Sequence, residues 1–325
     1  MVRGPIGSAT RIVNPKSILN TIEAAWSAAG AWPDFVHAMR QSLLAREGQP
    51  EAPSPRRSWL SLPGLCCRAA GGNLLVADGV AAAWALLYTA AHALDSIQDR
   101  DPPERWWAEL GEGPAINVAT GLLTTAWVVL DRIEADRSSV RRVIEDFHST
   151  VLWMASGQHL DLTVPLLTPD KAWAIAEAKS GAFFALACRS GARMAGAADA
   201  IAEHYGRYGL NLGLIVQIGD DMEDLVHCQG VPPLAVAYCL ETASLKARER
   251  LGIIMRSPTI DPSAQLEAVR ILTATGAPLY LQTKLFQMQS LALESLEAAS
   301  AEPTARKELA ALVQALAPSV EPTPA

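Results

Sequence analysis

The chain's decisive stretch reads QIGDDMED, residues 217–224, and it closes a long apolar run that begins near residue 208. The run predicts one helix, on which Asp220 and Asp224 are four residues apart and Asp221 and Asp224 are three apart. All three carboxylates therefore lie on one side of that helix. Unit charges about 4 Å apart repel by roughly 4 kcal/mol at an effective dielectric of 20, so this side favours a cation. Hard oxygen ligands suit Mg²⁺ that arrives with phosphates, whereas the alternative is an acidic helix end that contacts only water.

The remaining sequence predicts an all-α fold. Half of the 325 residues are hydrophobic, and the apolar residues recur with helical spacing and not in alternating runs. The longest predicted helices span residues 74–98, 138–162, 169–196 and 198–226. No repeat and no break in composition marks a second domain, so we expect one helical domain over residues 1–325, with 1–15 and 317–325 as flexible ends.

The composition argues against several classes of protein. A net charge of −7 and an isoelectric point near 5.4 disfavour a nucleic-acid-binding protein, which would carry a basic face. The five cysteines are scattered and contain no CxxC pair, which favours reduced thiols in a cytoplasmic protein over disulfides or a zinc site. The first residues lack the apolar core of a signal peptide. Residues 74–94 are the most apolar segment, but Asp78 and His92 interrupt it, so we expect a buried core helix and no stable membrane insertion.

A second acidic cluster, HALDSIQDRD at residues 92–101, follows that apolar segment. Asp95 and Asp99 are one helical turn apart and share a face, and His92 lies a turn before Asp95. Two helices that both end in carboxylates can face each other across a bundle and hold metal ions between them. We therefore expect the two acidic clusters to meet.

Three further polar residues lie between the two clusters in the sequence. Gln158 and Asp161 are three residues apart near the end of a predicted helix, and Lys179 interrupts an apolar segment. Such a lysine is either a surface residue whose methylenes cover apolar neighbours or a point charge for phosphate oxygens.

These segments together resemble the trans-isoprenyl diphosphate synthase (polyprenyl synthetase) superfamily. GQHLDL at residues 157–162 matches the family's GQxxDL, and KSGAFF at residues 179–184 resembles its K-T/S-G-x-L-F segment. QIGDDMED matches the second aspartate-rich motif, and a partial first motif begins at Asp95. The order and spacing of the four segments fit the family from about residue 59 to residue 240.

The resemblance implies a class I isoprenoid synthase helical bundle around a central apolar pocket. Three Mg²⁺ ions would hold an allylic prenyl diphosphate between the two acidic motifs and promote ionisation of its C–O bond as Lewis acids. The cation that forms needs a dry cavity, because water would quench it. The resemblance also implies a homodimer.

The resemblance assigns roles residue by residue. The implied metal ligands and catalytic acids are Asp95, Asp99, Asp220, Asp221 and Asp224, with Lys179 on the diphosphate. The implied substrate contacts are His92, Gln158, Asp161, Lys179, Gln217, Tyr88, Ala91, Phe183 and Arg105.

Several of these assignments have a structural alternative. His92 is otherwise a core histidine with a satisfied hydrogen bond, and Phe183 is otherwise ordinary core. Small residues at Ala90 and Ala91 either leave room for a C15 or C20 chain, which we expect, or only permit close helix packing.

The chain departs from the family where a second diphosphate would bind. Ser96 replaces an aspartate of the first motif, and Arg105 alone remains of the arginine pair that follows it. The segment SPRRSW at residues 54–59 keeps at most two cations, and HCQGVPP at residues 227–233 has no lysine. A diphosphate without cationic partners binds poorly. The sequence therefore favours an enzyme that ionises one prenyl diphosphate and then cyclises it, deprotonates it or captures water, as terpene synthases do.

Two other functions stay open. The first is a chain-elongating trans-prenyltransferase whose isopentenyl diphosphate is bound by arginines outside the family positions. The second is a non-catalytic regulatory subunit of such an enzyme, which the intact acidic triplet Asp220, Asp221 and Asp224 argues against.

Overall fold

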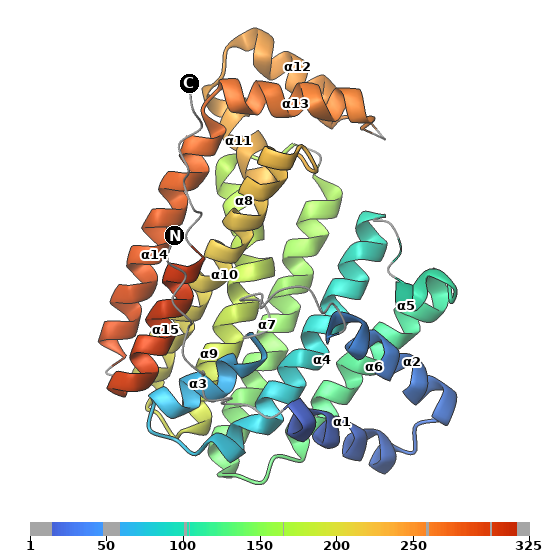
Figure 1. Cartoon of the computed structure of the whole chain (residues 1–325), viewed down its shortest axis with the longest axis vertical. Coiled ribbons are helices and arrows are strands. Elements are labelled where there is room, and N and C mark those ends of the chain that lie inside the picture. The colour runs from blue at the N-terminus through green and yellow to red at the C-terminus, as the bar shows by residue number, and fades with distance from the viewer. Residues whose placement is uncertain are drawn as a thin grey trace, which may run out of the picture. The chain divides into compact units, whose positions relative to one another are not determined.

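The computed structural model describes residues 15–47, 59–100, 103, 105–164, 166–257, 260–299 and 301–316, and its regular elements are all helices (Figure 1). This confirms the predicted all-α fold. The helices are α1 (Pro15–Ala29), α2 (Pro33–Glu47), α3 (Leu62–Ala69), α4 (Leu74–Asp99), α5 (Arg105–Ala108), α6 (Glu112–Asp131), α7 (Arg137–Thr163), α8 (Pro169–Ala176), the π-helical turn η2 (Glu177–Gly181), α9 (Ala182–Met194), α10 (Asp199–His227), α11 (Pro233–Thr242), α12 (Leu245–Met255), α13 (Pro262–Ala274), α14 (Ala277–Ala298) and α15 (Pro303–Ala315).

The contacts divide the chain into two compact units. Unit 1 comprises residues 1–146, 187–202 and 300–306, and unit 2 comprises residues 147–186, 203–299 and 307–325. A single domain over residues 1–325 stays a prediction. The predicted flexible ends lie outside the described residues, except for Pro15, which begins α1.

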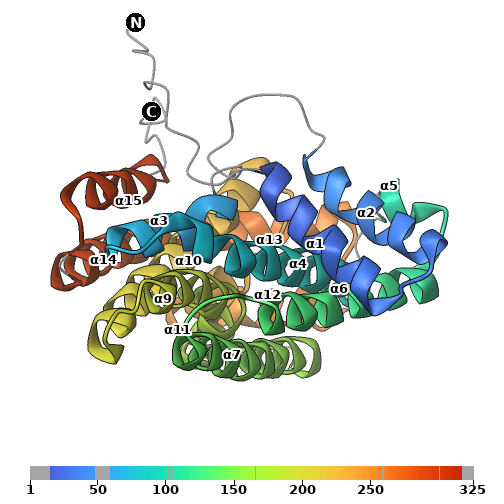
Figure 2. The same ribbon diagram turned by 90° about the horizontal axis from the view of Figure 1, so that it is seen from below.

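Unit 1 is built around α4, which lies beside α6 in both views (Figures 1 and 2). Trp26 on α1 donates a hydrogen bond from Nε1 to Thr125 Oγ1 on α6 (3.0 Å), so α1 is held to the same pair. The middle of α4 is buried on all sides, through Val80, Ala81, Ala82, Ala83, Trp84, Leu86 and Leu87.

Two helices of unit 1, Val76–Asp99 and Glu112–Asp131, are long and apolar enough to span a membrane by length and hydropathy. Of the most apolar part of the first, 67% is buried inside the protein, against 44% for the second. The first therefore has the burial expected of a core helix.

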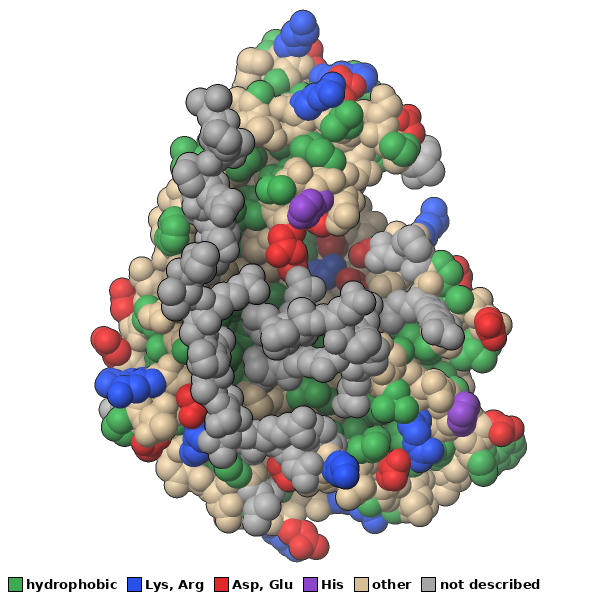
Figure 3. Space-filling view, viewed as in Figure 1, with side chains coloured by type: hydrophobic (Ala, Val, Ile, Leu, Met, Phe, Trp, Pro, Cys, Tyr) green, Lys and Arg blue, Asp and Glu red, His purple; other side chains and the backbone are tan. Residues whose placement is uncertain are grey.

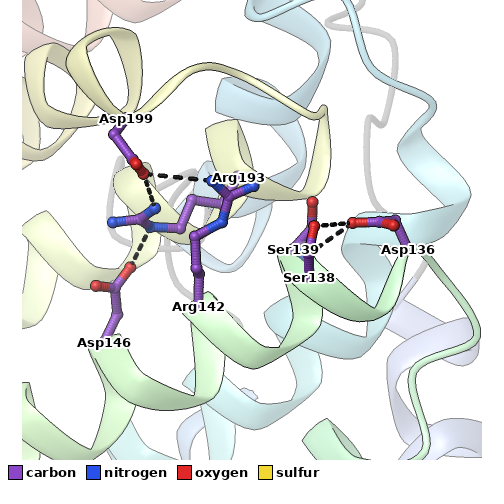
Figure 4. A network of polar contacts seen from close by, with 7 residues as sticks. All are labelled: Asp136, Ser138, Ser139, Arg142, Asp146, Arg193 and Asp199. Carbon is purple, nitrogen blue, oxygen red and sulfur yellow. Dashed lines mark hydrogen bonds and ion pairs between the residues drawn. The ribbon is translucent and has the colours of Figure 1, made fainter.

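A partly buried ion-pair network joins three helices of unit 1 (Figure 4). Arg193 on α9 donates from Nε to Asp146 on α7 (2.6 Å) and from Nη1 to Asp199 at the start of α10 (2.5 Å). The side chains of Arg193 and Asp146 are only 10% and 13% exposed, so their charges have lost most of their water. Arg142 on α7 adds a longer contact to Asp199 (3.5 Å).

Unit 2 packs α8, α11 and α14 through aromatic side chains. Tyr238 and Tyr280 stack with ring centroids 4.4 Å apart, and Trp173 Nε1 donates to Tyr280 Oη (2.8 Å). The helices α14 and α15 lie side by side in both views (Figures 1 and 2), where Gln289 Nε2 donates to the carbonyl of Val313 (3.3 Å).

We predict that Arg193→Ala lowers the free energy of unfolding by about 3 kcal/mol, because it leaves the partly buried carboxylate of Asp146 with the longer ion pair to Arg189 (3.8 Å) in place of its shortest one. The matched control is Arg250→Ala, which removes an ion pair to Glu267 whose side chains are 48% and 41% exposed and should cost about 1 kcal/mol or less. Urea unfolding followed by circular dichroism measures both. Equal costs for the two variants would contradict the assignment of Arg193 as a buried clamp.

Candidate functional site

The second acidic motif lies on the last turns of α10. Asp221 is buried, with 4% of its surface exposed, while Asp220 and Asp224 are half-buried. Gln217 donates from Nε2 to Asp221 Oδ1 (2.9 Å). Burial, opposed by this hydrogen bond and reinforced by the charges of Asp224 and Asp220, raises the pKa of Asp221 to about 7. The pKa of Asp224 is also raised, first by burial and then by Glu223.

The acids on α10 fit a magnesium ion only as part of its ligand set. Within the described ranges, no three His, Cys, Asp or Glu side chains gather closely enough to form a metal site on their own. Mg²⁺ is usually held by one or two carboxylates together with substrate phosphates and water, and not by an all-protein cage. Asp220, Asp221 and Asp224 repel one another at a partly buried helix end, so they can supply the one or two carboxylates that such a magnesium ion requires.

Lys179 lies in the π-helical turn η2 and is not an exposed surface lysine. Its Nζ donates to Asp161 Oδ2 on α7 (2.9 Å), and the two side chains are 24% and 25% exposed. Gly157 lets these elements approach, because a Cβ at that position would lie 2.7 Å from Ala178 Cβ. The motif segments 157–162 and 179–184 are therefore in contact. Gln158, which belongs to the first segment, is half-buried.

Ser180 links the same turn to the acidic motif. Its Oγ donates to Gln217 Oε1 (2.7 Å), and Gln217 in turn donates to Asp221. Three of the four predicted motif segments are thus joined inside unit 2, through Asp161–Lys179 and through Ser180–Gln217–Asp221. Sequence reasoning missed Ser180, although its place next to Lys179 was a usable signal.

The first acidic motif lies at the end of α4 in unit 1. Asp95 is half-buried, Asp99 is exposed, and Ser96, which replaces an acid, is buried. That Asp95 and Asp99 share metal ions with the motif on α10 stays a prediction. The side chain of Arg105 lies outside the described residues, as do Arg56 and Arg57.

The other predicted substrate contacts occupy different surroundings. Tyr88 is 40% exposed and stacks between Trp84 and His92, with ring centroids 6.3 Å and 6.4 Å away. Ala91 is half-buried on the same helix. In unit 2, Phe183 is buried and packs edge to face against Phe184 (5.7 Å). Their substrate roles stay predictions.

Figure 3 shows acidic and basic side chains mixed over one face of the molecule, with no continuous basic patch on the described residues of that face. A stripe for a nucleic-acid backbone would require such a patch.

The chain is similar to known proteins along most of its length. The sequence model of the polyprenyl synthetase family matches residues 64–231. A short chain isoprenyl diphosphate synthase of Methanothermobacter thermautotrophicus is 31% identical over 273 residues, which cover 77% of this chain and 82% of the relative. A geranylgeranyl diphosphate synthase of Methanosarcina mazei is 29% identical over 168 residues, 50% of this chain and 52% of the relative.

Solved structures agree on the fold. The geranylgeranyl pyrophosphate synthase of Corynebacterium glutamicum, crystallised with isoprenyl diphosphate and magnesium, aligns with a TM-score of 0.76 at 16% identity. The alignment covers 93% of this chain and 96% of that chain. At this identity the match supports the helical fold and nothing finer.

We predict that Asp221→Asn raises the melting temperature of the metal-free protein at pH 8 by several degrees. At that pH the wild-type carboxylate is charged and buried, and a pKa raised from 3.8 to about 7 is equivalent to a penalty of up to about 4 kcal/mol. Asparagine keeps the acceptor oxygen for Gln217 and removes the charge. The penalty builds up as the pH rises from 3.8 to about 7, so the gain should shrink at pH 5.

Differential scanning calorimetry with a chelator measures this gain. The control is Glu223→Gln, which neutralises an exposed acid on the same helix and should change the melting temperature much less than Asp221→Asn does. A melting temperature for Asp221→Asn at or below the wild-type value would show that its burial is not costly.

Proposed function

The chain belongs to the polyprenyl synthetase family of class I isoprenoid enzymes, and on that premise we propose that it is a Mg²⁺-dependent trans-prenyltransferase. It joins the prenyl group of an allylic diphosphate to isopentenyl diphosphate and releases diphosphate. The carrying observation is the polar cluster in unit 2, where Lys179 and the acidic end of α10 are joined through neighbouring residues of one π-helical turn. A cation and several carboxylates on otherwise apolar helices suit a substrate that is itself a metal-bound anion.

In this proposal, one set of residues binds the metal ions and another contacts the diphosphate. Asp220, Asp221 and Asp224 on α10 would hold Mg²⁺, as would Asp95 and Asp99 on α4. When bound, three Mg²⁺ ions supply Lewis acidity that weakens the bond between the prenyl carbon and the diphosphate oxygen.

Lys179 places a positive charge on the departing diphosphate, and Asp161 fixes the direction of its ammonium group. The bond to the diphosphate oxygen breaks, the double bond of isopentenyl diphosphate attacks the prenyl carbon, and a proton is lost. The proposed substrate contacts remain His92, Gln158, Gln217, Tyr88, Ala91, Phe183 and Arg105. We further propose a C15 or C20 allylic substrate, a cytoplasmic location and a homodimer.

A second function, a terpene synthase-like reaction of the allylic substrate alone, is favoured by the segment after the acidic motif. No lysine or arginine occurs between Asp224 and Lys246. The chain folds back tightly there, since the backbone N–H of Gln229 donates to the carbonyl of Asp224 (3.0 Å). A Cβ at Gly230 would lie 2.7 Å from Asp224 Oδ2. This turn therefore carries no lysine or arginine that could bind a second diphosphate. The named relatives, in contrast, support chain elongation.

We predict that the purified full-length protein, given Mg²⁺ with geranyl, farnesyl or geranylgeranyl diphosphate, forms a longer prenyl diphosphate only when isopentenyl diphosphate is added. A chelator should abolish the product, because the acids on α10 do not bind the diphosphate directly. Liquid chromatography of radiolabelled products and gas chromatography of volatiles measure both reactions. A hydrocarbon or alcohol formed from the allylic substrate alone would establish the second function instead. No product from any substrate, with stimulation of an active homologue, would establish the regulatory subunit.

We predict that Lys179→Gln lowers kcat by about 10²-fold, because a charge that stabilises the leaving group has this order of effect. The matched control is Lys171→Gln, an exposed lysine on the preceding helix α8, which should leave kcat unchanged. Steady-state kinetics with circular dichroism of both variants separates catalysis from folding. Equal kcat values for the two variants would exclude Lys179 from the reaction.

A further inference from the structure

A stripe of α10 residues lies directly against the backbone of η2 and α9. A Cβ at Gly209 would be 2.4 Å from the carbonyl oxygen of Phe184, and a Cβ at Gly213 would be 2.3 Å from that of Ser180. Both glycines are therefore required for this approach. Gln217 and Asp221 follow at the same spacing of four residues, so the four positions form one ridge that runs obliquely along the helix.

The π-helical turn η2 places the side chain of Ser180 against α10. Glu177–Gly181 is wound as one π-helical turn between α8 and α9, and such turns occur often at functional sites. The turn presents Lys179 to Asp161 on α7 and the next residue, Ser180, to Gln217 on α10. Two neighbouring side chains thus serve two different partners.

The carboxylate of Asp221 decides how the Gln217 amide is oriented, and the Ser180 hydroxyl holds the amide in that orientation. It donates to Oε1 (2.7 Å), which leaves Nε2 to donate to Asp221 Oδ1 (2.9 Å). The opposite orientation would place the amide oxygen against the carboxylate oxygen, where two acceptors repel. The amide therefore occupies one oxygen of Asp221, limits the rotation of its carboxylate and leaves the other oxygen for a further ligand.

We propose that Ser180 and Gln217 are positioning residues that fix the carboxylate of Asp221 for metal binding, with the π-helical turn holding Ser180 in reach. This rests on the proposed function of Asp221 as a ligand of Mg²⁺ bound to diphosphate. Neither residue needs to touch the metal, since side chains that orient a ligand change metal affinity by about 10- to 100-fold when they are removed.

The test measures Mn²⁺ binding in the presence of inorganic pyrophosphate by electron paramagnetic resonance, on the full-length protein. We expect Ser180→Ala to weaken Mn²⁺ binding by about tenfold and Ser180→Thr, which keeps the hydroxyl, to restore most of it. Gln217→Met should cause the same loss. The double variant should be no worse than either single variant, because both remove one connected unit.

The matched control is Ser156→Ala on α7, an exposed serine whose hydroxyl donates to the carbonyl of Leu152 in its own helix (2.9 Å). This variant should bind Mn²⁺ as the wild type does. Wild-type Mn²⁺ affinity in Ser180→Ala would overturn the proposal. Additive losses in the double variant would overturn it as well, because the two residues would then act separately.

Steady-state kinetics adds a readout that a packing defect would not reproduce. We expect Ser180→Ala to raise the Mg²⁺ concentration for half-maximal activity by about tenfold while the KM for the allylic substrate stays near the wild-type value. The pyrophosphate experiment does not depend on the acceptor. Absence of prenyl transfer together with weakened Mn²⁺ binding in Ser180→Ala would therefore reject the proposed reaction and keep the positioning role.

Discussion

A buried carboxylate beside two other acids is the constraint around which unit 2 is arranged. Asp221 is 4% exposed, and Asp220 and Asp224 lie within one turn of it on α10. A cluster of this kind is unfavourable until a cation shares the charge. Proteins retain such costs where function requires them, and the surrounding contacts then compensate only in part. Asp221 accepts a hydrogen bond from Gln217, which in turn accepts one from Ser180. Gly213 lets α10 approach the backbone of the π-helical turn that carries Ser180.

The charged side chains are distributed unevenly around the acidic motif of α10. Lys179 and the acids of α10 form a connected cluster, whereas residues 225–245 contain no lysine or arginine. The named relatives are isoprenyl diphosphate synthases. If the proposed chain elongation is correct, the cationic partners of isopentenyl diphosphate must therefore come from another part of the chain. Metal-assisted loss of diphosphate would be common to the elongation and cyclisation that we proposed as alternatives.

The sequence predicted the helical elements well because their apolar faces are long and continuous. The predicted helix 138–162 is Arg137–Thr163 in the structure, and the predicted helix 74–98 is Leu74–Asp99. The predicted helix 169–196 is helical from Pro169 to Met194, but the prediction did not include the π-helical turn Glu177–Gly181 within it. One extra residue in a turn hardly changes the spacing of apolar residues when most of them are small, so periodicity does not reveal it.

The site was predictable in its residue types but not in its connections. Spacing on one helix predicted that Asp220, Asp221 and Asp224 share a side, and the motif order identified Lys179 and Gln158. The contacts between helices were not predictable, because they depend on backbone approach at Gly157 and Gly213. Ser180 was missed because its partner on α10 depends on this packing, although its position next to Lys179 in the motif was a usable signal.

Metal-dependent binding of diphosphate to the acids of α10 is tested most directly by the melting temperature of the full-length protein with and without saturating Mg²⁺ and inorganic pyrophosphate together. A ligand that binds only the folded state stabilises it by about 2.7 kcal/mol at one hundred times its dissociation constant. We expect a rise of several degrees that needs both components and disappears when Asp220 and Asp224 are replaced by asparagine. No rise with the wild type, or the same rise with the double variant, would contradict it.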